Sequence, residues 1–221
     1  MCGFAGVIAW DDRYRFTRDT LARMSLAIAH RGPDGEGVYL NHEDEVKPGR
    51  PQVGLVHRRL AILDPDPRSN QPFTDGRHWL VFNGEIYNYR ELRAELKTLL
   101  PNYAWRTEGD TEVLLASYAA WGEKCVEHLN GMFAIAIWDD VEKSLFLARD
   151  RMGQKPLYVQ PIKGCVSFAS EPNAITGKSE ASGHPIWWGD FLRYGCCTYM
   201  PWHDIGQIAP GLWQLFRATG D

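Results

Sequence analysis

The segment Gly131–Trp138 (GMFAIAIW) constrains the fold most, because apolar residues or glycine occupy all eight of its positions. A strand of this kind is covered on both of its faces. Asp139-Asp140 then turns the chain, and Ser144–Ala148 is predicted to return beside the first strand as a hairpin. The chain must therefore build a sheet that carries packed structure on each side.

Further strands and helices are predicted around this hairpin. Periodicity predicts helices over Thr17–Ala29, Tyr89–Leu100 and Asp110–Trp121. Asn83-Gly84, a dipeptide typical of turns, is expected to end a strand at Phe82. Several strands and few helices indicate an α+β fold with sheets stacked between layers of helices. The remaining predicted strands are Gly3–Trp10, Val53–Leu63, Trp79–Phe82, Leu157–Val159 and Cys165–Ala169.

Length and composition suit one domain with a proper core, since 44% of the 221 residues are hydrophobic. A net charge of -4 gives no reason to expect a nucleic-acid partner, which needs a basic patch. No apolar run approaches the ~20 residues of a membrane span. Residues 2–176 are expected to form the core of the domain, and 177–221 to extend it. This extension has a linker-like stretch at 177–185 and a short predicted helix near Trp187–Tyr194.

The cysteines and the N-terminus bear on location. The number of cysteines is odd and no CxxC pair occurs, so we expect neither a disulfide framework nor a zinc site. The N-terminal segment lacks the charged lead and apolar length of a signal peptide. The sequence therefore favours a reducing, cytoplasmic setting. The five cysteines are Cys2, Cys125, Cys165, Cys196 and Cys197.

Cys2 is the first candidate for chemistry. Removal of the initiator methionine, which is usual before a small residue, exposes both the thiol and the α-amine of Cys2. An α-amine has a pKa of roughly 7.7–8.0 and acts as a base near neutral pH. An adjacent base raises the nucleophilicity of a thiol. Taken alone, Cys2 is better explained as a small buried hydrophobic residue.

Three other features complete a set. Asn83-Gly84 supplies an amide and a backbone N–H that suit an oxyanion hole, although a hairpin turn explains the same pair. Arg59 suits bidentate capture of a carboxylate, although a solvated basic turn is the plainer interpretation. Asp110 suits an α-ammonium group, or caps a helix together with Thr107. With Cys2, these residues supply what hydrolysis of a free amino-acid amide requires.

Eight motifs in order make the chain similar to a known family. It resembles the class II glutamine amidotransferase domain, most of all the N-terminal half of glutamine-hydrolysing asparagine synthetases. The resemblance is dense over 2–176 and weaker up to Trp213. The motifs are Cys2-Gly3, HRGPDG (30–35), HRRLAILD (57–64), NGEIYNYRELR (83–93), GDTEVLL (109–115), LNGMFAIAIWD (129–139), LARDRMGQKPLY (147–158) and FASE (168–171).

The resemblance implies a fold and a set of roles. The family fold is the four-layer αββα sandwich of N-terminal nucleophile hydrolases. Cys2 matches the nucleophile, with its own α-amine as base, and Asn83 and Gly84 match the oxyanion hole. Arg59 matches the group that holds the α-carboxylate of glutamine, and Asp110 the group that holds its α-ammonium. The other residues that line the family's pocket match Leu60, Ala61, Ile62, Leu63 and Glu85.

The implied reaction is hydrolysis of L-glutamine through a thioester on Cys2, with neither metal nor cofactor. ATP and Mg are expected only with a synthetase domain or partner, because the chain contains no SGG-type pyrophosphate loop. Two alternatives stay open: a glutaminase of amino-sugar or purine synthesis, and a catalytically silent interaction domain.

The remaining conspicuous polar residues are expected to be structural: the histidines His30 and His57, and turn ion pairs of Arg31, Asp34, Arg149 and Asp150.

Overall fold

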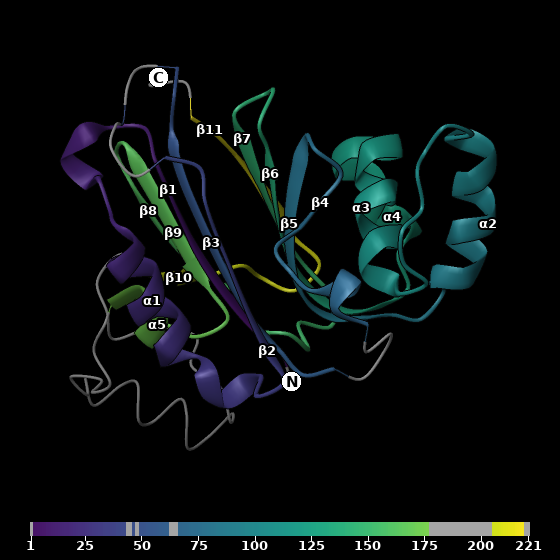
Figure 1. Cartoon of the computed structure of the whole chain (residues 1–221), viewed down its shortest axis with the longest axis horizontal. Helices are drawn as coiled ribbons and strands as arrows, with labels where there is room; N and C mark the ends of the chain where they lie inside the picture. The colour runs from purple at the N-terminus through teal and green to yellow at the C-terminus, as the bar shows by residue number, and fades with distance from the viewer. Residues whose placement is uncertain (1, 43–45, 47–48, 62–65, 177–204, 219–221) are drawn as a thin grey trace.

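The fold consists of two antiparallel sheets that lie face to face, with helices on the outer face of each (Figure 1). It is seen in a computed structural model that describes residues 2–42, 46, 49–61, 66–176 and 205–218. The layer order helix–sheet–sheet–helix confirms the predicted α+β class and its αββα sandwich.

The first sheet has six strands in the order β10-β8-β9-β1-β3-β2. Its centre is β1, which pairs antiparallel with both β3 and β9. The strands are β1 (Gly3–Ala9), β2 (Gly35–Leu40), β3 (Gln52–Arg59), β8 (Tyr158–Ile162), β9 (Cys165–Ala169) and β10 (Gly206–Gln207).

The second sheet has five strands in the order β11-β7-β6-β5-β4. The predicted hairpin forms its centre, since β6 pairs with β7 on one side and with β5 on the other. The strands are β4 (Phe73–Thr74), β5 (His78–Ile86), β6 (Gly131–Asp139), β7 (Ser144–Arg149) and β11 (Trp213–Arg217).

The helices form the two outer layers. Helices α1 (Arg18–Ala27) and α5 (Asn173–Thr176) cover the six-stranded sheet, and α2 (Tyr89–Leu99), α3 (Asp110–Trp121) and α4 (Cys125–His128) cover the other. Among the described residues, no helix is long and apolar enough to cross a membrane. Short 3-10 turns lie at Asp12–Tyr14, Ala29–Arg31, Pro67–Ser69 and Gly122–Lys124.

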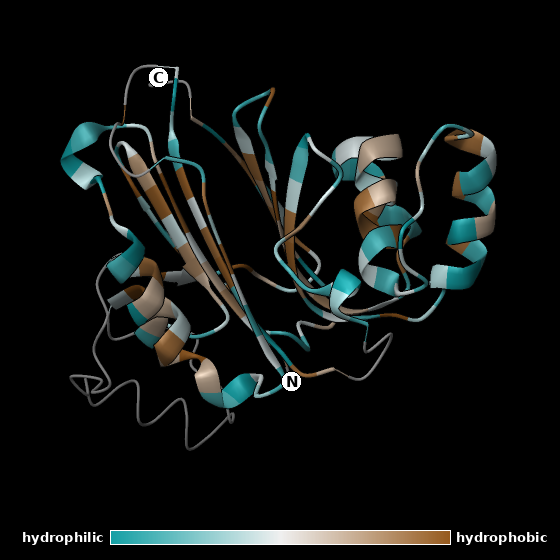
Figure 2. Cartoon of the chain, in the orientation of Figure 1, coloured by the Kyte–Doolittle hydropathy of each residue, from teal (hydrophilic) through white to brown (hydrophobic). Residues whose placement is uncertain are grey.

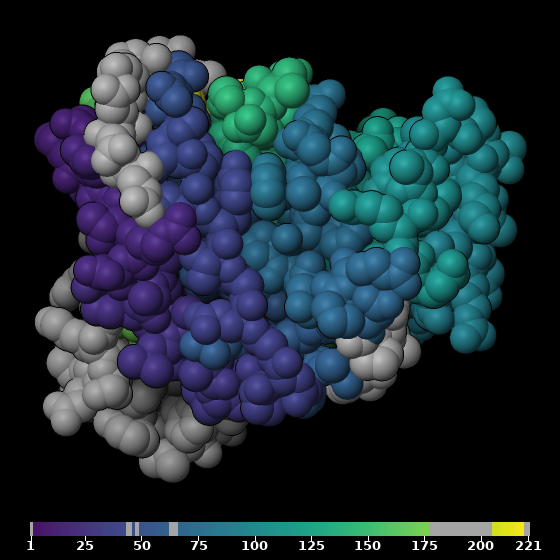
Figure 3. Space-filling view, in the orientation of Figure 1, coloured from purple at the N-terminus to yellow at the C-terminus, as the bar shows by residue number. Residues whose placement is uncertain are grey.

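Three apolar clusters fill the three spaces between the layers. The strand β6 shows why its sequence is apolar throughout: Ile135 and Ile137 face the helices, while Ala136 and Trp138 face the other sheet. Hydrophobic residues accordingly lie along the strands and on α3, which is enclosed between α2 and the sheet (Figure 2). The space-filling view shows the layers in continuous contact on this face (Figure 3).

Several boundaries differ from the predictions. The strand β5 does not end at Phe82 but continues to Ile86, so Asn83 and Gly84 lie inside a strand that pairs with β6. The preceding strand β3 ends at Arg59 rather than Leu63. Strands β2 and β11 were not predicted. The predicted helix near 187–194 and the linker at 177–185 lie outside the described residues.

Candidate active site

Strand alternation on β3 directs a charged side chain between the sheets. Val53 and Leu55 belong to the cluster between the two sheets, whereas Val56 faces α1. Because side chains alternate along a strand, His57 and Arg59 lie on the same inward face as Val53. The apolar face of β3 thus becomes polar at the end of the strand.

Cys2, which directly precedes β1, lies beside this polar end of β3. Phe4 and Ile8 face inward, so the alternation puts Cys2 on the inward side just before the strand begins. Its Sγ lies 3.3 Å from the backbone nitrogen of Leu60 and 3.5 Å from the carbonyl oxygen of Leu60. The Nε of Arg31 donates to the carbonyl of Cys2 at 3.0 Å. These contacts fix the thiol beside the end of β3.

The opposite wall comes from β5. Val81 faces the six-stranded sheet, so Asn83 and Glu85 also point between the sheets. Asn83 is only 2% exposed, and its Nδ2 has no hydrogen-bond partner among the described residues. A buried amide donor without a partner is rare in folded proteins. It is therefore suited to an acceptor that arrives with a ligand.

The edge of β5 beside β4 is open, because β4 has only two residues, which pair with Leu80 and Trp79. Farther along this edge, the amide of Phe82 donates to Gln71 Oε1 at 2.6 Å and the amide of Ile86 to Asp110 Oδ2 at 3.0 Å. Backbone groups alternate in direction along an antiparallel strand. The amide of Gly84 therefore lies on this edge between the other two.

Position 84 requires a glycine for a steric reason. A Cβ at this position would collide with the carbonyl oxygen of Met132 on β6. Only glycine permits this close approach of the two backbones. The dipeptide Asn83-Gly84 is thus compatible with a paired strand, although its composition is typical of turns.

Asp110 is the first residue of α3 and is largely buried. Burial raises the pKa of its carboxyl to about 6, and the nearby charge of Glu85 acts in the same direction. The hydrogen bonds from Ile86 and from the helix start oppose this shift. A cation that binds next to Asp110 would lower the pKa again by favouring the ionised form.

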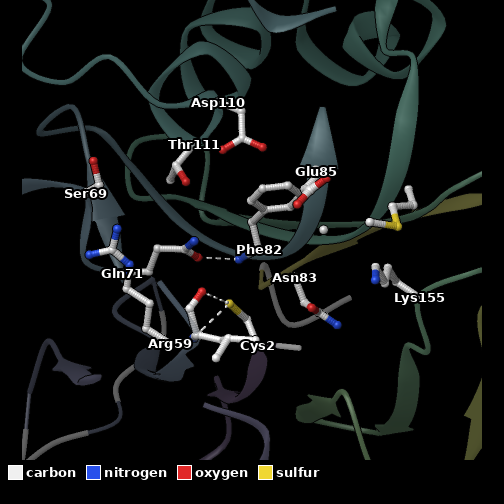
Figure 4. A pocket seen from close by; sticks show the side chains of 13 residues that line it. Cys2, Arg59, Ser69, Gln71, Phe82, Asn83, Glu85, Asp110, Thr111 and Lys155 are labelled. Carbon is white, nitrogen blue, oxygen red and sulfur yellow. Dashed lines mark hydrogen bonds between the residues drawn. The ribbon is translucent and has the colours of Figure 1, made fainter. Parts of the chain in front are cut away.

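One pocket of about 110 Å³ brings these groups together (Figure 4). A single water needs only ~10–15 Å³, so there is room for a small polar ligand. The Nη1 of Arg59, on the wall, is braced by the carbonyl of Asp66 and by Asn70 Oδ1. Of the residues expected from the sequence, the lining includes Cys2, Arg59, Leu60, Asn83, Gly84, Glu85 and Asp110.

Of the three remaining expected residues, the structure describes only Ala61, which is not part of the pocket lining. The amide of Ala61 donates instead to Asp34 Oδ2 at 2.9 Å, outside the pocket lining. Ile62 and Leu63 lie outside the described residues. Six further lining residues were not expected, although the motifs GDTEVLL, LNGMFAIAIWD and LARDRMGQKPLY each contain one of them. These residues are Ser69, Gln71, Phe82, Thr111, Met132 and Lys155.

The two histidines have structural surroundings. His57 is fully buried, its Nε2 lies 3.2 Å from the carbonyl of Phe82, and burial lowers its pKa to about 4. His30 and Arg31 share the carboxylate of Glu171, at 2.9 and 2.8 Å. Among the described residues, no group of three or more His, Cys, Asp or Glu side chains is placed to hold a metal ion.

Three of the four residues that were expected in turn ion pairs contact backbone groups. Asp34 accepts the amide of Ala61, and Arg149 donates to three carbonyls. Asp150 accepts four backbone amides, because its buried carboxylate lies inside a tight turn. The amides that Asp150 accepts belong to Phe133, Met152, Gln154 and Lys155.

Comparison with known protein families identifies the family of the chain. The glutamine amidotransferase domain matches residues 1–220. The chain belongs to this family. Among curated relatives, asparagine synthetase [glutamine-hydrolyzing] 1 of Bacillus subtilis is 40% identical over 179 residues, covering 79% of this chain. Asparagine synthetase [glutamine-hydrolyzing] 3 of Arabidopsis thaliana is 36% identical over 182 residues, covering 81%. The matched region is 26% and 29% of those proteins, so the chain spans about a quarter of their length.

Solved structures confirm the fold. Glutamine phosphoribosylpyrophosphate amidotransferase from B. subtilis superposes with a TM-score of 0.59, covering 79% of this chain and 43% of that one. A second structure, of the allosteric regulatory enzyme of purine biosynthesis, gives 0.61 with the same coverage. Both are 19% identical to the family member described here, so the likeness is one of architecture.

Proposed function

We propose that this domain hydrolyses the side-chain amide of L-glutamine to glutamate and ammonia through a glutamyl thioester on Cys2. Membership of the glutamine amidotransferase family supports the substrate class. The observation that carries the proposal is the partnerless buried Nδ2 of Asn83 in one pocket with Cys2. Such a donor is poised for charge that develops only during reaction.

The proposed chemistry has two steps. Removal of Met1 frees the α-amine of Cys2, which takes the thiol proton as the sulfur attacks the amide carbon of glutamine. Asn83 Nδ2 and the Gly84 amide stabilise the oxyanion, and the α-ammonium then gives its proton to the departing ammonia. Water, deprotonated by the same amine, attacks the thioester, releasing glutamate and restoring the thiol.

The charges of the pocket suit a free α-amino acid. In the proposal Arg59 holds the α-carboxylate and Asp110 the α-ammonium. The two opposite charges lie away from Cys2 in Figure 4, with Asn83 near the sulfur. A substrate without the α-amino group would leave the buried carboxylate of Asp110 uncompensated, which is costly. This favours glutamine over simple amides.

The similarity to asparagine synthetases favours asparagine synthesis as the reaction that uses the ammonia. We propose that the domain is the glutaminase part of such an amidotransferase, in the cytoplasm, with aspartate activation by ATP and Mg in a synthetase domain or partner. Hydrolysis itself uses no cofactor in this proposal. The 36–41% identities to asparagine synthetases support this branch over amino-sugar or purine synthesis.

The test is the intact mass of the purified protein before and after 6-diazo-5-oxo-L-norleucine, a glutamine analogue that alkylates a nucleophile. Loss of Met1 and one adduct on Cys2 are the expected results, and a Cys2→Ala variant is expected to take no label. Unlabelled wild-type protein that has lost Met1 would refute the proposal. Labelling of Cys2→Ala would place the nucleophile elsewhere.

A further inference from the structure

We propose that His57 and Gln71 are positioning residues that together hold the backbone of Phe82, and through it align Asn83 and Gly84 with Cys2. The inference rests on the proposed function and adds two residues that do not touch the reacting atoms of glutamine. Its basis is the pair of contacts at Phe82: Gln71 Oε1 to the amide nitrogen at 2.6 Å and His57 Nε2 to the carbonyl oxygen at 3.2 Å.

The two contacts at Phe82 take the place of the strand pairing that a longer β4 would supply. The amide and the carbonyl of one residue point to the same side of an antiparallel strand. For Phe82 this side is the edge that β4 leaves open, since β4 pairs only with Leu80 and Trp79. Backbone groups buried without partners are costly, so side chains must serve them. The side-chain amide of Gln71 and the imidazole of His57 bind these groups at Phe82, immediately before Asn83.

The His57 contact has a defined polarity. A carbonyl oxygen only accepts, so the Nε2 of His57 must carry the proton and donate to Phe82. The side chain is fully buried on the inward face of β3, and a pKa near 4 keeps the ring neutral at working pH. The contact therefore crosses from one sheet to the other and does not change with pH in the neutral range.

The backbone of Gln71 is itself fixed by strand β2 of the six-stranded sheet. Gln71 is 7% exposed and lines the pocket just before β4. A Cβ on Gly37 of β2 would collide with the carbonyl oxygen of Gln71, so the two backbones touch. The six-stranded sheet therefore fixes both partners of Phe82, through Gly37 for Gln71 and through β3 for His57.

Alignment matters here because pairing with β6 holds Asn83 and Gly84 from one side only, and the contacts at Phe82 hold the opposite edge of β5 directly before them. Asn83 Nδ2 makes no hydrogen bond with the described residues, and Gly84 lies on the open edge of β5. A misplacement of about 1 Å in a catalytic site costs on the order of 10²-fold in rate. Freeing Phe82 should therefore reduce stabilisation of the tetrahedral state while leaving Arg59 and Asp110 in place.

The experiment compares Gln71→Met and His57→Leu, which lack the hydrogen-bonding atoms, with the wild type. His57→Gln serves as the rescue variant, because its amide nitrogen reaches the position of Nε2. The control is Gln52→Met: Gln52 is also buried and binds both backbone groups of Phe16, but at the far end of β3. Two affinities are measured, for glutamate and for L-glutamate γ-semialdehyde, whose aldehyde adds the Cys2 thiol to give a tetrahedral adduct.

We expect Gln71→Met and His57→Leu to lose about 10²-fold in kcat and in semialdehyde affinity, with KM and glutamate affinity nearly unchanged. His57→Gln should recover most of the loss, and Gln52→Met should keep the wild-type ratio of the two affinities. The inference would be overturned if Gln71→Met kept the wild-type ratio of semialdehyde affinity to glutamate affinity. It would also be overturned if Gln52→Met lost as much semialdehyde affinity as Gln71→Met. Wild-type protein that neither hydrolyses glutamine nor binds the semialdehyde would instead overturn the proposed function itself.

Discussion

Asn83 carries an energetic cost in the free protein. An unmade hydrogen bond of a buried polar group costs about 1–3 kcal/mol, and the Nδ2 of Asn83 is such a group within the described part of the chain. The cost disappears when an oxygen acceptor enters the pocket. A negatively charged acceptor gains most, since hydrogen bonds to ionised groups are roughly twice as strong as neutral ones.

Asn83→Ala should therefore lower kcat for glutamine hydrolysis by about 10²–10³-fold. KM should change little, because the proposed contacts to the α-carbon groups come from Arg59 and Asp110. Steady-state glutamate formation measures both constants. Asn102→Ala, which changes an exposed asparagine in the loop after α2, is the matched control and should match the wild type. A rise in KM with unchanged kcat would show that Asn83 only binds substrate.

Asp110 should make glutamine binding depend on pH. Its raised pKa of about 6 means that the carboxyl is increasingly protonated below pH 6 in the free protein. An ammonium group binds the ionised form, so binding should release a proton and weaken as pH falls through 6. Above about pH 7 the affinity should be constant with respect to this group.

Calorimetry on the Cys2→Ala variant checks this, because glutamine binds there without turnover. Glu85 is the other carboxylate that acts on Asp110, so Glu85→Gln should move the transition to lower pH. Asp110→Asn should bind weakly and lose the transition near pH 6. A transition that survives in Asp110→Asn would assign the proton to a different group.

The residues of the pocket were largely predictable from sequence where the chemistry demands a particular side chain. Cys2, Arg59, Asn83 and Asp110 were singled out by their functional groups together with the resemblance to the amidotransferase domain, and all four line the pocket. Gln71 was not predictable, because its contact with Phe82 depends on β4 ending after two residues, which no local pattern encodes.

At the level of elements, β6 and β5 show when local pattern succeeds and when it fails. The apolar run of β6 predicted burial on both faces, and the two clusters on either side of it confirm this. The dipeptide Asn83-Gly84 predicted a turn in β5, but pairing with β6 overrides this preference. Strand β2 was missed because its exposure alternates without an apolar face, as expected for an edge strand.

Ile135→Ala in β6 should lower the free energy of unfolding by about 2–5 kcal/mol. The side chain is fully buried between the sheet and the helices, so its removal leaves a cavity. Val141→Ala, in the turn that follows β6, changes a side chain that is 65% exposed and should stay within about 0.5 kcal/mol of the wild type. Urea unfolding followed by circular dichroism measures both, and equal losses would contradict the assigned core.

At the scale of the molecule, the C-terminal segment belongs to both sheets. Strand β10 pairs with β8 and β11 pairs with β7, so the chain after residue 205 adds an edge strand to each sheet. Ile208 and Ala218 lie in the cluster between the sheets. This pairing supports the expectation that 177–221 extends the same domain as 2–176, a division that stays a prediction.

A chain that ends at residue 176 should be less stable by at least about 3 kcal/mol, since it loses the buried side chains of this segment. It should also self-associate, because the edge of β7 becomes unpaired. Urea unfolding and size-exclusion chromatography test the two effects. A chain ending at Ala218 is the control, as it keeps both strands. Unchanged stability of the shorter chain would show that the segment is dispensable.

The brevity of β4 also sets how quickly the amides of β5 exchange their protons with water. Side chains hold the amides of Phe82 and Ile86, whereas Gly84 lies between them on the open edge. Hydrogen exchange followed by NMR should therefore find Gly84 the fastest of the three in the free protein, because protected amides exchange only on local opening. Formation of the semialdehyde adduct should slow exchange at Gly84 selectively, so that this one amide reports occupancy of the proposed oxyanion hole in real time.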